Sequence, residues 1–114
     1  MHCHEPSFAE RVDEVVAKAG PLFAEAVGDA RKWRSWVRNA RDSVAHRGPK
    51  MIDVDKEWRT TIRVTRTIEW LMILVLLRDL GIDDEVVASG VREEGGLKAA
   101  SEMLKLVKPE WFPE

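Results

Sequence analysis

The residues between positions 31 and 50 combine the side chains that could act on a phosphate group. Seven of them are basic, namely Arg31, Lys32, Arg34, Arg38, Arg41, Arg47 and Lys50. Asp42 is the only acidic residue in this stretch, although the whole 114-residue chain has 18 basic and 20 acidic residues and a formal charge of −2. A local basic patch on a slightly acidic chain indicates a polyanionic ligand; the plain alternative is a solvated helix face.

His46 follows Asp42 by four residues, so on a helix the two side chains can meet on one face. Asp42 could then hold one imidazole nitrogen and fix the tautomer of the ring. A position at the C-terminal end of a helix favours the protonated imidazole, which can donate a proton to a leaving oxygen. The forked donors of Arg38 and Arg41 suit the oxygens of a phosphate.

These groups fit cleavage of RNA without a metal or a cofactor. RNA brings its own nucleophile, the 2′-hydroxyl, and the protein must stabilise the anionic phosphorus centre and protonate the departing 5′-oxygen. We expect Arg41, His46 and Asp42 to be the catalytic residues. The residues expected to bind RNA are Arg31, Arg34, Arg38, Arg47 and Lys50. One helix places Arg41 and His46 about 140° apart, so we expect two copies of the chain to form one composite groove.

The elements that must position these residues are helices. Ser7 and Glu10 have the spacing of a capping box, and Gly20-Pro21 and Gly48-Pro49 end helices. The expected helices span 8–19, 22–27, 30–46, 54–80, 84–92 and 97–107. The chain is therefore expected to be an all-α, up-and-down bundle of four main helices with short extra helices. We expect one domain over 7–108, a disordered segment 1–6 and a tail 109–114.

The third of these helices has one narrow apolar stripe, made by Trp33, Trp36, Val37, Ala40 and Val44. The basic residues, Asp42 and His46 project outside that stripe, with His46 opposite the tryptophans. We therefore expect His46 to face solvent or a partner chain, outside the core.

The fourth helix is apolar nearly all round between Ile68 and Leu77, which predicts burial on most sides. In so small a domain, we expect a second copy of the chain to supply the extra cover. Trp33, Trp36, Trp58 and Trp70 are expected in the core or an interface in preference to base-stacking positions, and Trp111 is expected to pack on the bundle or on a partner.

The stretch Arg41-Asp42-Ser43-Val44-Ala45-His46 resembles the signature of HEPN ribonuclease domains, an Arg, a polar residue and a His four to six positions after the Arg. With Trp33 and Trp36 before it, Gly48 after it and the helix ending in 76–81, the sequence from 7 to 108 resembles the ApeA-like HEPN branch. That branch commonly has Asn at the position of Asp42; here an Arg-Asn pair stands one turn earlier, at Arg38-Asn39.

The resemblance implies a helical bundle, a homodimer with the motif at its interface, and metal-independent cleavage of an RNA such as tRNA or mRNA. It also implies a role in bacterial defence against phage or in a toxin system, with a regulatory domain or an antitoxin as a further partner. Such domains often sit at the C-terminal end of longer proteins.

Other features exclude further classes or leave them open. The single cysteine, Cys3, excludes an internal disulfide and fits a cytoplasmic protein, and no apolar run approaches the roughly 20 residues of a membrane span. His2, Cys3 and His4 at a frayed end are not expected to hold a metal. Two alternatives to the ribonuclease remain: a non-catalytic RNA-binding or dimerisation module, and a partner-binding helical domain.

Overall fold

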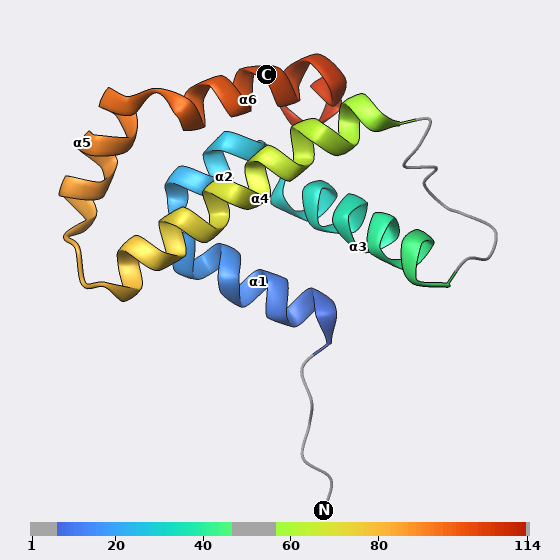
Figure 1. Cartoon of the computed structure of the whole chain (residues 1–114), viewed down its shortest axis with the longest axis horizontal. Coiled ribbons are helices and arrows are strands. Elements are labelled where there is room, and N and C mark those ends of the chain that lie inside the picture. The colour runs from blue at the N-terminus through green and yellow to red at the C-terminus, as the bar shows by residue number, and fades with distance from the viewer. Residues whose placement is uncertain (1–6, 47–56, 114) are drawn as a thin grey trace, which may run out of the picture.

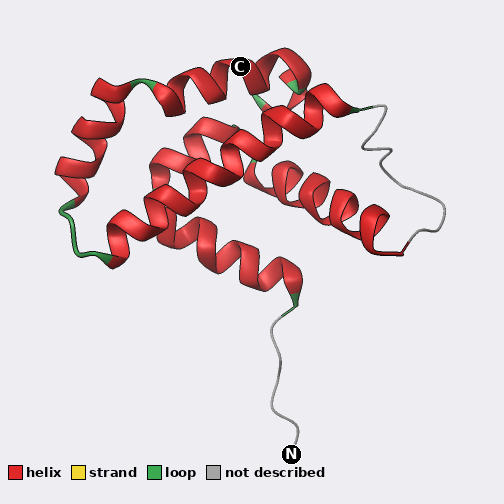
Figure 2. Cartoon of the chain, in the orientation of Figure 1, coloured by secondary structure: helices red, strands yellow, loops and turns green. Residues whose placement is uncertain are grey.

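The computed structural model describes residues 7–46 and 57–113, and the side chains of 44–46 are outside that description. The described residues form helices and contain no strand (Figure 2). The elements are α1 (Phe8–Ala19), α2 (Pro21–Val27), α3 (Ala30–His46), α4 (Trp58–Asp79), α5 (Asp84–Glu94), α6 (Gly96–Val107) and a 3-10 helix, η1 (Pro109–Trp111). The predicted all-α class is confirmed, and the order of four main up-and-down helices stays a prediction.

Local side-chain hydrogen bonds set where several helices begin. The Ser7 hydroxyl accepts a hydrogen bond from the backbone N–H of Glu10 (3.1 Å), as the capping-box spacing predicts. The Asp29 carboxylate accepts one from the N–H of Lys32 (3.1 Å), and Asp83 accepts one from the N–H of Glu85 (2.9 Å). The fourth helix was expected from 54, and in the described residues it begins at Trp58.

Helix α4 lies at the centre of the fold. It crosses α1 and α2 on one side and runs beside α6 on the other, while α3 lies below its N-terminal half (Figure 1). Its buried side chains, Val64, Thr67 and Leu74 among them, share one core with Trp33 and Phe23, the largest fully buried side chains. The Phe23 and Trp33 rings meet edge-to-face, with centroids 5.1 Å apart, which anchors α2 to α3.

The C-terminal segment belongs to the same core. Trp111 is buried, so the indole packs on the bundle, one of its two expected placements. Its backbone approaches Gly28 so closely that a Cβ at Gly28 would lie 2.2 Å from the carbonyl oxygen of Trp111. The φ of Gly28 is +77°, a conformation that residues with a side chain rarely adopt. Both the close contact and this backbone conformation therefore require glycine.

The expected burial of the second half of α4 is only partly met. Leu71 and Leu74 are buried, but Met72, Ile73 and Leu76 are exposed along the opposite side of the helix. These three residues are called the apolar face of α4 below. The single chain packs against one side of α4 here and leaves the other side open, so the expected cover by a second copy stays a prediction. None of the described helices combines the length and apolar composition needed to cross a bilayer.

Candidate functional site

The described residues of the predicted motif lie on α3, and the helical period places Arg41 and Ser43 on different sides of that helix. Trp33 and Trp36 are buried and Val37 and Ala40 pack against the core, which confirms the described part of the predicted stripe. Ser43, which is outside that prediction, is buried too. Arg31, Arg38 and Arg41 are exposed on the other side. A helix turns by 100° per residue, so a stripe of buried residues leaves the remaining arc open to solvent. The basic surface of α3 is therefore available to a ligand.

Arg41 is positioned by α1. Its guanidinium carbon lies 4.6 Å from the centroid of the Phe8 ring, and the side chain is 57% exposed. A guanidinium over an aromatic face is attracted by the ring quadrupole and loses little access to a second ligand. Because Ser7 caps α1, the cap also fixes the backbone that carries Phe8. This contact could not be predicted from sequence, because Phe8 and Arg41 are far apart in the chain.

Asp42 lies between two arginines. Its Oδ1 is 3.8 Å from Arg41 Nη1, and its Oδ2 is 3.9 Å from Arg38 Nε. Both distances exceed hydrogen-bond length, so these are loose ion pairs of the kind that add little to stability. Their effect is to lower the local positive potential at the residues expected to contact phosphate.

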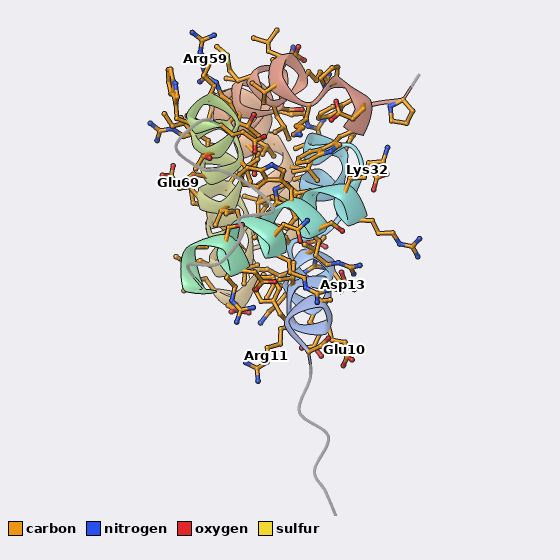
Figure 3. All side chains as sticks on the ribbon, turned by 90° about the vertical axis from the view of Figure 1, so that its right-hand side faces the viewer. Glu10, Arg11, Asp13, Lys32, Arg59 and Glu69 are labelled. Atoms are coloured by element: carbon orange, nitrogen blue, oxygen red, sulfur yellow. The ribbon has the colours of Figure 1, made fainter. Side chains whose placement is uncertain are left out.

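Arg34 is engaged by α1. Its Nη1 lies 2.6 Å from Oδ2 of Asp13, and its side chain is the more buried member of the pair. Figure 3 shows Asp13 on α1 beneath α3. Lys32, also labelled there, donates a hydrogen bond to the backbone carbonyl of Glu110 (3.2 Å). The structure therefore gives Arg34 and Lys32 roles in holding helices together, while Arg31, Arg38 and Arg41 form the open basic surface.

His46 is the last residue of α3, as predicted, but its side chain lies outside the described residues. Arg47 and Lys50 lie outside them as well, and so do His2, Cys3 and His4. Among the residues that are described, no group of three acidic, histidine or cysteine side chains could hold a metal ion. The contact between the Asp42 carboxylate and the His46 imidazole therefore stays a prediction.

The N-terminal half of α4 carries a second group of basic side chains, which was not expected to be part of the site. Trp58, expected in the core or an interface, is 54% exposed within this chain, with the guanidinium carbon of Arg59 5.3 Å from its ring centroid. Arg59, Arg63 and Arg66 follow at spacings of four and three, which places them on one side of the helix. This spacing in the sequence is enough to predict a second basic surface on the fourth helix.

One family model matches the chain. It describes the Apea-like HEPN family and covers residues 1–86, from the N-terminus through α4 into α5. The motif on α3 lies inside this match. Comparison with curated proteins and with solved structures gives no match.

Proposed function

The chain belongs to the Apea-like HEPN family, and from this premise we propose that it is a metal-independent endoribonuclease that acts as a homodimer. Domains of this family are often ribonucleases and generally act as dimers that bind RNA. The observation that carries the proposal is the position of exposed Arg41 and half-buried Asp42 on the last turns of α3, the helix that ends at His46.

The proposed reaction uses the 2′-hydroxyl of the RNA as nucleophile. Its oxygen forms a bond to the adjacent phosphorus, the bond from phosphorus to the 5′-oxygen breaks, and the products are a 2′,3′-cyclic phosphate and a free 5′-hydroxyl. The imidazolium of His46 gives its proton to the 5′-oxygen, and the neutral imidazole of the second copy accepts the proton of the 2′-hydroxyl. Arg41, assisted by Arg38, binds the phosphate oxygens, where negative charge builds up in the transition state.

Helix geometry supports a second copy. Positions five residues apart on an ideal helix, such as 41 and 46, are separated by about 140° around the axis, which favours a site that takes Arg41 from one copy and His46 from the other. The apolar face of α4 offers a contact surface for a second copy, because Met72, Ile73 and Leu76 are exposed on the single chain. We propose bacterial defence against phage or a toxin system as the biological setting, with tRNA or mRNA as the substrate class.

The proposal is tested by His46→Ala in the full chain, with a mixed tRNA and mRNA pool and EDTA in the buffer. We expect the wild type to cut RNA in EDTA and to leave 2′,3′-cyclic phosphate ends, and the variant to lose cleavage with an unchanged melting temperature. Arg92→Ala is the matched control, since this exposed arginine lies on α5. Cleavage at the wild-type rate by His46→Ala would overturn the assignment.

One observation favours a second candidate, a non-catalytic RNA-binding or dimerisation module. Asp42 occupies the motif position where the branch commonly has Asn, and its carboxylate partly neutralises Arg38 and Arg41. A purified dimer that binds RNA in a salt-sensitive way but leaves the whole pool uncut would establish this candidate instead.

A further inference from the structure

The N-terminal end of α4 presents an exposed aromatic ring among basic side chains. Trp58 is more than half exposed, and Arg59 extends over its ring at 5.3 Å. Figure 3 shows Arg59 at the outer end of α4, away from α1. A large exposed indole is unusual on a surface unless a ligand or a partner covers it, because burial of the ring is strongly favourable.

The indole borders a hollow between α4 and α6. Its volume is about 310 Å³, and its lining residues are Trp58, Arg59, Ile62, Arg63, Leu106 and Val107. Three of the lining residues are aliphatic, and the α4 side carries two guanidinium groups. A nucleotide fits this arrangement, because its flat base can pack on the apolar side chains while its phosphates contact the two guanidinium groups.

The charge of this surface is unbalanced. Neither Arg59 nor Arg63 has an ion pair among the described residues, whereas Arg66 is paired with Glu69 (3.1 Å). On the facing helix and just beyond it, Lys105 and Lys108 already have acidic partners in Glu102 and Glu110. Arg59 and Arg63, beside Trp58, are thus the cations of this surface that can bind an anionic ligand without first breaking an ion pair.

We propose that this surface, formed by Trp58, Arg59 and Arg63, binds a single-stranded segment of RNA that flanks the cleaved phosphate. One base stacks on the Trp58 indole, and the two arginines contact phosphates on either side of it. Base stacking on an aromatic side chain accepts any base, and arginines supply the charge that single strands require. The inference rests on the proposed ribonuclease function for the choice of RNA as ligand.

The position of the surface agrees with this role. The start of α4 and the end of α3 lie at the same end of the molecule, on the right in Figure 1. An RNA strand that has its reactive phosphate at the end of α3 can therefore continue toward α4 without crossing the rest of the domain.

Charge argues against a second copy of the chain as the occupant of the same surface. A two-fold interface brings a patch against itself, so Arg59 and Arg63 of both copies would be drawn together with no acidic partner in the patch. The apolar face of α4, which has no charged residue among its three members, has no such penalty. We therefore assign the dimer contact to that face and the RNA contact to Trp58.

The test measures binding in a His46→Ala background, with the full chain and a fluorescein-labelled single-stranded 20-mer RNA followed by anisotropy at several salt concentrations. We expect Trp58→Ala to weaken binding about tenfold and Trp58→Phe to restore most of it, because a smaller ring still stacks. Arg63→Ala should weaken binding and lower the salt dependence by about one ion per site. Trp58→Ala should leave binding to a blunt duplex of the same length unchanged.

The control is Val86→Ala, which removes a similarly exposed apolar side chain on α5, at the other end of the molecule (Figure 1). Equal binding of the single strand by Trp58→Ala and the parent would overturn the inference. A shift of Trp58→Ala from dimer to monomer in sedimentation velocity would overturn it in favour of a protein contact. If the chain proves unable to cleave RNA while the Trp58 dependence holds, the ribonuclease proposal fails, and the single-strand contact at Trp58 stands without its placement beside a cleaved phosphate.

Discussion

The indole N–H of Trp33 donates a 2.9 Å hydrogen bond to the hydroxyl of Thr67, and both residues are almost completely buried. The bond joins α3, which carries the candidate site, to the middle of α4. The Thr67 hydroxyl in turn donates to the carbonyl of Val64, one turn earlier on the same helix. The bond gives α3 a fixed rotation about its own axis, and so fixes which arginines face outward.

We expect Thr67→Val to destabilise the fold by about 1–3 kcal/mol, because the valine keeps the shape but leaves the buried indole N–H without an acceptor. Urea unfolding measures the change. Thr65→Val is the matched control: its hydroxyl donates to the Thr61 carbonyl on the exposed side of the same helix, so its effect should stay within about 0.5 kcal/mol. Equal losses in the two variants would contradict the role of the bond.

We expect Arg41→Ala to lower kcat/KM for RNA cleavage about 100-fold, since it removes the forked donor proposed to stabilise the phosphorus centre. Arg41→Lys should lie between this variant and the wild type, because lysine keeps the charge but cannot donate two parallel hydrogen bonds. Arg38→Ala should act mainly through a higher KM, as expected of a supporting contact. The ranking is checked by steady-state kinetics, and an Arg38→Ala loss larger than that of Arg41→Ala would move the catalytic role one turn earlier.

Asp42→Asn should bind RNA more tightly, by about three- to tenfold at low salt, because the carboxylate 3.8–3.9 Å from Arg41 and Arg38 is removed. The gain should fade as the salt concentration rises. Asp42→Ala separates charge from orientation: it should share the tighter binding but lose kcat, since the alanine cannot hold an imidazole. Identical kcat values for the Asn and Ala variants would show that Asp42 does not position His46.

Leu76→Arg should convert the proposed dimer into a monomer, because it puts a charge in the centre of the apolar face of α4. The side chain is 58% exposed in the single chain, so the monomer should still fold, with an unchanged circular dichroism spectrum. Cleavage should fall together with dimerisation. Val15→Arg is the control on α1, with 39% exposure, and should remain dimeric. Sedimentation velocity decides the matter, and a Leu76→Arg dimer would place the interface elsewhere.

The candidate site could be predicted from sequence only as far as one helix extends. The period of Trp33, Trp36 and Val37 fixes which side of α3 is buried, and the structure confirms Trp33 and Trp36 in the core and Arg38 and Arg41 outside it. Contacts between residues of two different helices could not be predicted from sequence. Arg34 was expected to bind RNA, but its guanidinium lies 2.6 Å from Asp13 on α1.

Local chemistry in the sequence determined the helices. A cap such as Ser7 with Glu10, or Asp83 with Glu85, joins residues two or three positions apart, and therefore needs no information about the rest of the fold. The alternation of apolar and basic residues along α3 likewise fixed its two faces. Tertiary structure alone decided that Phe8 lies beneath Arg41 and that Trp58 stays exposed while Trp111 is buried. The reason is that these outcomes depend on which helices meet, and residues distant in the chain are brought together by the packing of the whole core.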